Sequence, residues 1–243
     1  MVREAFEITT MKRPFINRSD AGKFLAQRLR AYINRADVRV LGLPRGGVPV
    51  ALEVAQRLKV PFDVFVVRKL RLPDSPEIVI GAIATGGVRV TNRDLIESWQ
   101  IPQLVVDAVA AQEQEKLARR ERAYRGDVPQ HEVKGRTVVL VDDGIATGST
   151  MLAAIAGLRQ LEAARIVAAA PVIAGSIYQR IRQAADDVAA VIVPEEFYGI
   201  GEWYEDFSMI TDDEVCQLLA EAKKVEPVAP TPAQALNTAG SLV

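Results

Sequence analysis

The chain has 243 residues, of which 30 are basic and 31 acidic, so its formal net charge is −1. This balance gives no broad basic surface and argues against nucleic acid or an anionic membrane as the main partner. Cys216 is the only cysteine, which excludes a disulfide within this sequence, and we expect a buried structural thiol. Apolar runs stay short of the roughly 20 residues that span a membrane, and we expect a cytoplasmic protein.

Short apolar runs alternate along the chain with segments of helical periodicity. In chain order they predict a helix from Ser19 or Asp20 to about Ala36, a strand over Val38–Leu43, a helix over Val48–Leu58, strands over Phe62–Val67, Ile78–Thr85 and Val88–Thr91, a helix from Pro102 to about Arg125, a strand over Thr137–Val141, a helix over Thr150–Leu161, a strand over Arg165–Pro171, a helix over Ser176–Ala184, a strand over Val188–Val193 and a last helix over Asp212–Leu219. This order favours a parallel sheet that binds ligand at the carboxyl ends of its strands.

The two ends of the chain and one internal stretch do not follow this pattern. Residues 1–14 have no clear period and are expected to form an arm, and residues 225–243, rich in Pro, Ala and Thr, are expected to be disordered. His131, the only histidine, lies in a polar stretch typical of a surface loop. A histidine-based catalytic triad or metal site is therefore poorly supported, and one domain over residues 15–224 is predicted.

A glycine turn follows the strand predicted over Val38–Leu43. Gly46 and Gly47 let an anion approach the backbone at the start of a helix, where unpaired N–H groups favour negative charge. Arg45 adds a planar fork that suits phosphate oxygens. A plain turn with an exposed arginine fits these residues equally well, so the turn alone leaves both interpretations open.

A second such turn, from residue 142 to 150, follows the buried strand over Thr137–Val141. Its small residues and hydroxyls can hold a phosphate at the helix start, whereas Asp142 and Asp143 would repel one. These acids need another partner, such as sugar hydroxyls or Mg²⁺. The stretch predicts a phosphorylated sugar as ligand, with an ordinary acidic-rimmed turn as the alternative. The spacings of P-loop and dinucleotide-binding motifs are missing.

The run VDDGIATGST resembles the ribose-phosphate signature of the type I phosphoribosyltransferases, which bind phosphoribosyl pyrophosphate (PRPP). The runs FINRSDAG, LGLPRGGVPVA, DVFVVRKL, YRG and YEDF are similar to a bacterial subgroup of predicted phosphoribosyltransferases with undefined acceptors. Together they cover roughly residues 15–219. The resemblance implies a doubly wound α/β fold with a mainly parallel sheet flanked by helices, a β-hairpin or loop over the site, and a small C-terminal hood at about residues 194–210.

The resemblance also implies a reaction, namely transfer of the phosphoribosyl group from PRPP to an unidentified nitrogenous base, with Mg²⁺ and release of pyrophosphate. Asp142 and Asp143 would bind the metal. The implied catalytic residues are Arg45, Arg68, Lys69 and Asp143. The implied PRPP-binding residues are Arg45, Gly46, Gly47, Asp142, Asp143, Gly144, Ala146, Thr147, Gly148, Ser149 and Thr150. Such glycine turns often hold a cis non-proline peptide, which we expect near Arg45–Gly47.

Three features bear on the acceptor and on closure of the site. Enzymes for hypoxanthine and guanine carry an aspartate where this chain has Ala146, so those bases are disfavoured. Residues 71–77, expected as a loop that closes over the reaction, contain two prolines and no glycine, so a large closing motion is doubtful. In the hood, Phe197, Trp203 and Tyr204 could stack on a base, although core packing would explain them too.

Two other functions stay open at this point. The chain could be a PRPP or nucleotide sensor with little turnover, or a hydrolase that uses water as acceptor. The charged helix predicted from Pro102 could form a dimer contact, so a homodimer is possible. A small-molecule acceptor is the partner expected besides PRPP.

Overall fold

The computed structural model describes residues 15–126 and 132–225. The expected N-terminal arm, His131 and residues 226–243 of the expected tail lie outside them, whereas Val225, where that tail was expected to begin, is helical. The elements are α2 (Arg18–Arg28), η1 (Arg30–Tyr32), β1 (Val38–Gly42), α3 (Gly47–Leu58), β2 (Phe62–Val64), β3 (Val67–Leu72), β4 (Ser75–Ala84), β5 (Val88–Thr91), α4 (Arg93–Ser98), α5 (Gln103–Arg125), β6 (Thr137–Val141), α6 (Ser149–Gln160), β7 (Arg165–Val172), α7 (Gly175–Ala184), β8 (Asp187–Ile192), η2 (Ile200–Trp203) and α8 (Asp212–Val225). Within the described part, every helix is too short or too polar to cross a bilayer.

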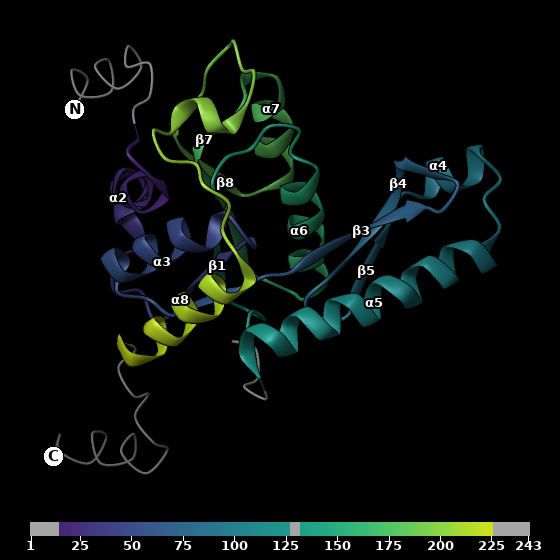
Figure 1. Cartoon of the computed structure of the whole chain (residues 1–243), viewed down its shortest axis with the longest axis horizontal. Helices are drawn as coiled ribbons and strands as arrows, with labels where there is room; N and C mark the ends of the chain where they lie inside the picture. The colour runs from purple at the N-terminus through teal and green to yellow at the C-terminus, as the bar shows by residue number, and fades with distance from the viewer. Residues whose placement is uncertain (1–14, 127–131, 226–243) are drawn as a thin grey trace, which may run out of the picture.

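Five of these strands form a parallel sheet in the order β2-β1-β6-β7-β8. Its central strand β6 is buried along its whole length, as expected for a strand covered on both faces. Val139 and Val141 join the core beneath α2, α3 and α8, whereas Val138 and Leu140 join the core beneath α6 and α7. Figure 1 shows these helix groups on opposite sides of the sheet. The predicted doubly wound, mainly parallel fold is confirmed.

The remaining strands form a separate antiparallel sheet in the order β3-β4-β5. Together with α4 and α5 we call this region, residues 67–125, the β-arm. Figure 1 shows the β-arm extending away from one side of the parallel sheet, with α5 running along it and α4 at its far end. Gly86 and Gly87, both with positive φ, form the predicted turn between β4 and β5.

The segment expected to be a loop at residues 71–77 is a β-hairpin. Leu72 pairs with Ser75, which leaves a two-residue turn, and the register shifts so that Arg71 pairs with Val79. Pro76 falls in this irregular stretch, where a residue without an N–H donor is tolerated. The prediction of a loop is therefore wrong, because the prolines occupy the turn and the bulge.

Other boundaries moved for local reasons. The strand predicted over Phe62–Val67 is split, because the chain leaves the parallel sheet at Phe65 and enters the β-arm at Val67. The first helix is capped by Asn17, whose side chain accepts from the N–H of Asp20, and it ends at residue 28. Cys216 is only partly buried, and its thiol donates to the carbonyl of residue 123 at 3.3 Å.

The β-arm is anchored to the parallel sheet by the last residues of α5. The Arg125 guanidinium pairs with the Asp63 carboxylate of β2 at 2.8 Å, and both side chains are 7% exposed. It also donates to the carbonyl of Val64. Beside it, the Tyr124 hydroxyl donates to Asp212 at the start of α8. The YRG run of the sequence therefore ties α5 to the sheet and to α8.

Candidate functional site

The two glycine turns lie at the same edge of the parallel sheet. β1 and β6 pair in parallel, with Gly42 opposite Val141, so both strands end at one level. Just beyond this level, the N–H of Leu43 donates to the carbonyl of Val141 at 2.8 Å. α3 and α6 begin at the two turns and direct their N-termini to this edge.

The turns are in direct contact, and glycine is required for it. A Cβ added to Gly46 would lie 1.9 Å from Oδ2 of Asp143. A Cβ added to Gly47 would lie 2.6 Å from the carbonyl oxygen of Val141 and 2.8 Å from Cα of Asp142. Any larger residue would separate the turns. The residues expected to hold pyrophosphate and those expected to hold ribose thus form one site.

Arg45 follows an unusual peptide bond at this site. The bond between Pro44 and Arg45 is cis, as expected for this turn. The Arg45 side chain extends to the segment before α8, where its Nη2 lies 3.6 Å from Sδ of Met209. A guanidinium at the edge of two helix N-termini adds to their attraction for an anion.

The two acids occupy different surroundings. Asp143 is 8% exposed, and its Oδ2 accepts from Nε of Arg18 at 2.8 Å. Asp142 accepts the backbone N–H of Asp143 at 2.9 Å, and it is more accessible than its neighbour. Burial and the adjacent Asp143 charge raise the pKa of Asp142 well above its ordinary value. A cation near Asp142 would relieve both effects.

The described residues contain no cluster of three or more acidic, histidine or cysteine side chains that could hold a metal. The two turns instead offer one pair of adjacent carboxylates, Asp142 and Asp143. This donor set fits Mg²⁺, which is commonly held by one or two carboxylates together with the phosphates of a substrate.

The second turn presents its small residues and hydroxyls at the start of α6. Gly148 has φ +69°, and a side chain there would meet Ile177 of α7 at 2.6 Å. Thr147 and Ser149 are exposed, and their hydroxyls lie 3.2 Å apart. Exposed hydroxyls at the N-terminus of α6, a helix of 12 residues, suit a phosphate group.

Comparison with known proteins identifies the family of this chain. A sequence model described as the phosphoribosyl transferase domain matches residues 16–206. The chain belongs to the phosphoribosyl transferase domain family. In Mycobacterium tuberculosis, "Putative phosphoribosyl transferase Rv0571c" and "Putative phosphoribosyl transferase MT0597" are each 43% identical over 210 residues, 86% of this chain and 47% of each relative. The chain spans about half the length of these curated relatives.

A solved structure extends the comparison to the fold of this phosphoribosyl transferase domain. The crystal structure of TT1426 from Thermus thermophilus is 40% identical and has a TM-score of 0.77. The match covers 85% of this chain and 98% of that chain. The resemblance drawn from the sequence is thus confirmed for the family and for the fold.

In the phosphoribosyl transferase domain, the hood rests on the second turn. Tyr204 is 1% exposed, and its hydroxyl donates to the backbone carbonyl of Asp143 at 2.6 Å. Its ring packs against those of Phe15 and Phe207, with centroids 5.4 and 5.0 Å away. This burial does not fit the expected stacking of Tyr204 on an acceptor, because neither ring face is open; the residue instead supports the signature backbone.

Phe197 and Trp203, the other two hood residues expected to contact an acceptor, are less deeply buried than Tyr204. Phe197 is partly buried against both hood and sheet. Trp203 is also partly buried, and its indole N–H has no hydrogen-bond acceptor among the described residues. A buried donor without an acceptor is uncommon in native structures and is often explained by a missing ligand or water.

Arg68 and Lys69, expected as catalytic residues, lie at the base of the β-arm. Arg68 donates through Nε and Nη2 to Glu113 of α5, at 2.8 and 2.7 Å. This ion pair directs Arg68 to the β-arm helix, and its expected catalytic role stays a prediction. Lys69 forms no ion pair within residues 15–126 and 132–225, and burial together with the charge of Arg71 lowers its pKa.

Arg18 is the residue that sequence reasoning missed. It lies within the FINRSDAG run that supported the resemblance, but its position 125 residues before Asp143 gave no reason to connect the two. No local pattern could have found it, because the pair forms only when the start of α2 is folded against the carboxyl edge of the sheet.

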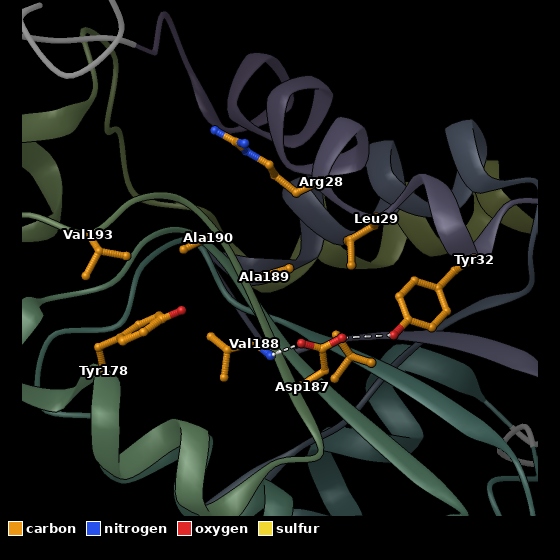
Figure 2. Close-up of a pocket in the computed structure, with 10 residues that line it drawn as sticks. Arg28, Leu29, Tyr32, Tyr178, Asp187, Val188, Ala189, Ala190 and Val193 are labelled. Carbon is orange, nitrogen blue, oxygen red and sulfur yellow. Dashed lines mark hydrogen bonds between the residues drawn. The ribbon is translucent and has the colours of Figure 1, made fainter. Parts of the chain in front are cut away.

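The phosphoribosyl transferase domain also has a pocket of about 260 Å³ along the edge strand β8. Figure 2 shows Arg28, the last residue of α2, and the next residue Leu29 on one side of the strand and Tyr178 of α7 on the other, while Tyr32 donates to Asp187 at 3.4 Å. None of the residues lining this pocket belongs to either glycine turn. The pocket is therefore separate from the candidate site.

Proposed function

We propose that this chain is a Mg²⁺-dependent phosphoribosyltransferase that binds PRPP and transfers its phosphoribosyl group to a nitrogenous base, releasing pyrophosphate. The family supports the reaction class. The observation that carries the proposal is the contact between the turns, where a Cβ on Gly46 would reach within 1.9 Å of Asp143. One turn can hold pyrophosphate only beside the sugar held by the other.

Each group of PRPP then has a matching part of the site. The N–H groups and hydroxyls at the start of α6 would hold the 5′-phosphate, and the Asp142 and Asp143 carboxylates would accept from the ribose hydroxyls. The glycine turn and Arg45 would hold the pyrophosphate. When bound, Mg²⁺ would be held by Asp142 and Asp143 and would supply positive charge to the pyrophosphate.

In the reaction, the bond from ribose C1 to a pyrophosphate oxygen breaks, and a bond from C1 to an acceptor nitrogen forms. The sugar becomes cationic in the transition state while negative charge grows on the leaving group. Arg45 and the helix N-termini oppose that growing charge, which is the main way this site can lower the barrier. Lys69 is a further candidate for this role because it carries a charge without an ion-pair partner among the described residues.

For the acceptor we retain Phe197 and Trp203 in the hood. The free indole N–H of Trp203 could donate to a ring nitrogen or carbonyl of a base. Ala146 offers no proton-transfer group, which disfavours hypoxanthine and guanine. Adenine, orotate and related acceptors stay open.

One observation favours a sensor with little turnover as the second candidate. The β3–β4 connection, expected to close over the reaction, is a hairpin with a two-residue turn. A paired hairpin is less able to exclude water by closing than a free loop. A sensor would use the same PRPP site but would not need such a lid.

Calorimetry with PRPP and Mg²⁺, followed by a pyrophosphate-release assay over a panel of bases, tests these candidates. Binding with release supports the transferase, binding without release supports the sensor, and formation of ribose 5-phosphate indicates a hydrolase. Asp142→Asn should weaken PRPP binding by about tenfold or more, because charge-assisted contacts to ribose are lost. Asp213→Asn, at an exposed residue of α8, is the matched control. Equal affinity in both variants would refute the assigned site.

A further inference from the structure

Arg18 makes three contacts that join separate parts of the molecule. Its Nε donates to Oδ2 of Asp143, and its Nη1 donates to the carbonyl of Ser208, both at 2.8 Å. Its guanidinium carbon lies 3.9 Å from the centre of the Phe207 ring. Arg18 is 8% exposed, so these contacts are largely shielded from water and stronger for it.

Ser208 and Phe207 belong to the segment that leads from η2 to α8, residues 205–211, which we call the strap. The strap is paired at its start, where the N–H of Glu205 donates to Phe15 and the N–H of Asp206 donates to Ile16, both at 2.9 Å. Three residues beyond Asp206, Met209 contacts Arg45 of the glycine turn. The strap thus contacts both Arg18 of α2 and Arg45 of the first glycine turn.

Arginine is suited to this position. Asp143 is nearly buried and stands next to Asp142, so a paired cation both compensates its buried carboxylate and fixes its orientation. A guanidinium can donate to the carboxylate and to a carbonyl at once while its face contacts an aromatic ring. A lysine could neutralise Asp143 but could not make all three contacts.

We propose that Arg18 is a positioning residue that holds Asp143 against the glycine turn and ties the strap to the same carboxylate. The order of the strap and the affinity for PRPP are then linked through one side chain. This inference rests on the proposed function for its PRPP part only. The tie between Arg18 and the strap can be measured without any ligand.

Hydrogen exchange of the ligand-free protein measures that tie. In Arg18→Met the strap amides, those of Glu205 and Asp206 above all, should exchange about tenfold faster, because a charge-assisted hydrogen bond and a cation–π contact are lost. Arg28→Met is the matched control, since it makes the same change at an exposed residue of the same helix. Unchanged strap exchange in Arg18→Met would overturn the proposal.

Arg18→Lys separates the two roles of the side chain and provides a folded variant if Arg18→Met fails to fold. It should leave Mg²⁺–PRPP affinity within about threefold of the unsubstituted protein while the strap exchanges as fast as in Arg18→Met, which should bind about tenfold more weakly. A purely structural role would change stability and leave the affinity of folded protein unaltered in both. If the unsubstituted protein binds no PRPP, the proposed function and the link fail, while the exchange rates still decide whether Arg18 ties the strap.

Discussion

The parallel sheet and the β-arm differ in how their strands are held. β6 is buried on both faces along its length, whereas all four residues of β5 are partly exposed. Two of the parallel strands, β1 and β6, end at the glycine turns that carry the candidate site, while the strands of the β-arm are fixed to its helix α5 by ion pairs such as Arg89–Asp107 and Arg68–Glu113. The proposed chemistry therefore concentrates where buried strands end, and substitutions in the β-arm away from Arg68 and Lys69 should disturb it little.

The largest expected effect on ligand binding contrasts a glycine of each region. Gly46→Ala should weaken PRPP binding by roughly 100-fold, because its methyl group would displace Asp143 and separate the turns. Gly87→Ala, at φ +73° with nothing nearer than 3.8 Å, should leave PRPP affinity unchanged and cost about 1 kcal/mol of stability. Calorimetry measures the PRPP affinity of each variant, and urea unfolding measures its stability. Unchanged PRPP affinity in Gly46→Ala would contradict the conclusion that PRPP binding depends on the contact between the two turns.

The largest expected effect on stability concerns the joint between the regions. Arg125→Met would leave Asp63 buried without this ion-pair partner and should cost about 3 to 5 kcal/mol of the free energy of unfolding. Arg122→Met, at an exposed residue of the same helix turn, should stay within about 0.5 kcal/mol. Urea unfolding followed by circular dichroism gives both values. A second transition in Arg125→Met would indicate that the β-arm unfolds separately, and equal stability of the two variants would contradict the assigned anchor.

The parallel sheet was predictable from the sequence because its rules are local. Alternating apolar runs and helices imply a parallel order, and parallel strands share one carboxyl edge, so the two glycine turns could be expected near each other. Thr137–Val141 was predicted with the observed bounds. The signature run was equally readable as a mark of the family, which the sequence model over residues 16–206 confirms.

The β-arm and the hood were less predictable because their contacts are distant in sequence. The prolines of residues 71–77 suggested a loop, and only pairing with the second half of the hairpin shows that they fit a turn and a bulge. Tyr204 looked available for stacking until Phe15 and Phe207 were placed beside it. Arg18 gave no signal at all, because its partners Asp143 and Ser208 follow it by 125 and 190 residues.

A smaller effect, on stability, tests whether Arg68 has a structural or a catalytic role. If its ion pair only holds β3 to α5, Arg68→Met and Glu113→Gln should each cost about 1 kcal/mol of stability. Both should keep the PRPP affinity and turnover of the unsubstituted protein, as measured by calorimetry and pyrophosphate release. A loss of turnover in Arg68→Met with normal turnover in Glu113→Gln would instead restore a catalytic role for the arginine.

The smallest effect is a pH dependence at the second contact of the β-arm, between α5 and α8. The Tyr124 hydrogen bond, followed by the charges of Arg120 and Arg45, lowers the pKa of Asp212 against the opposing effect of burial. A lowered pKa stabilises the fold above the ordinary value of 3.8, and this contribution is lost as the pH falls below it through the folded-state pKa.

Tyr124→Phe should therefore cost about 0.5 kcal/mol near neutral pH, a small value because Asp212 is half exposed and screened by solvent. The cost should vanish in acid, where Asp212 is protonated in both proteins. Urea midpoints of the two proteins across the acid range measure the difference. If the difference between the two urea midpoints stayed constant with pH, ring packing would account for the lost stability, and the α5–α8 contact would not depend on the charge of Asp212.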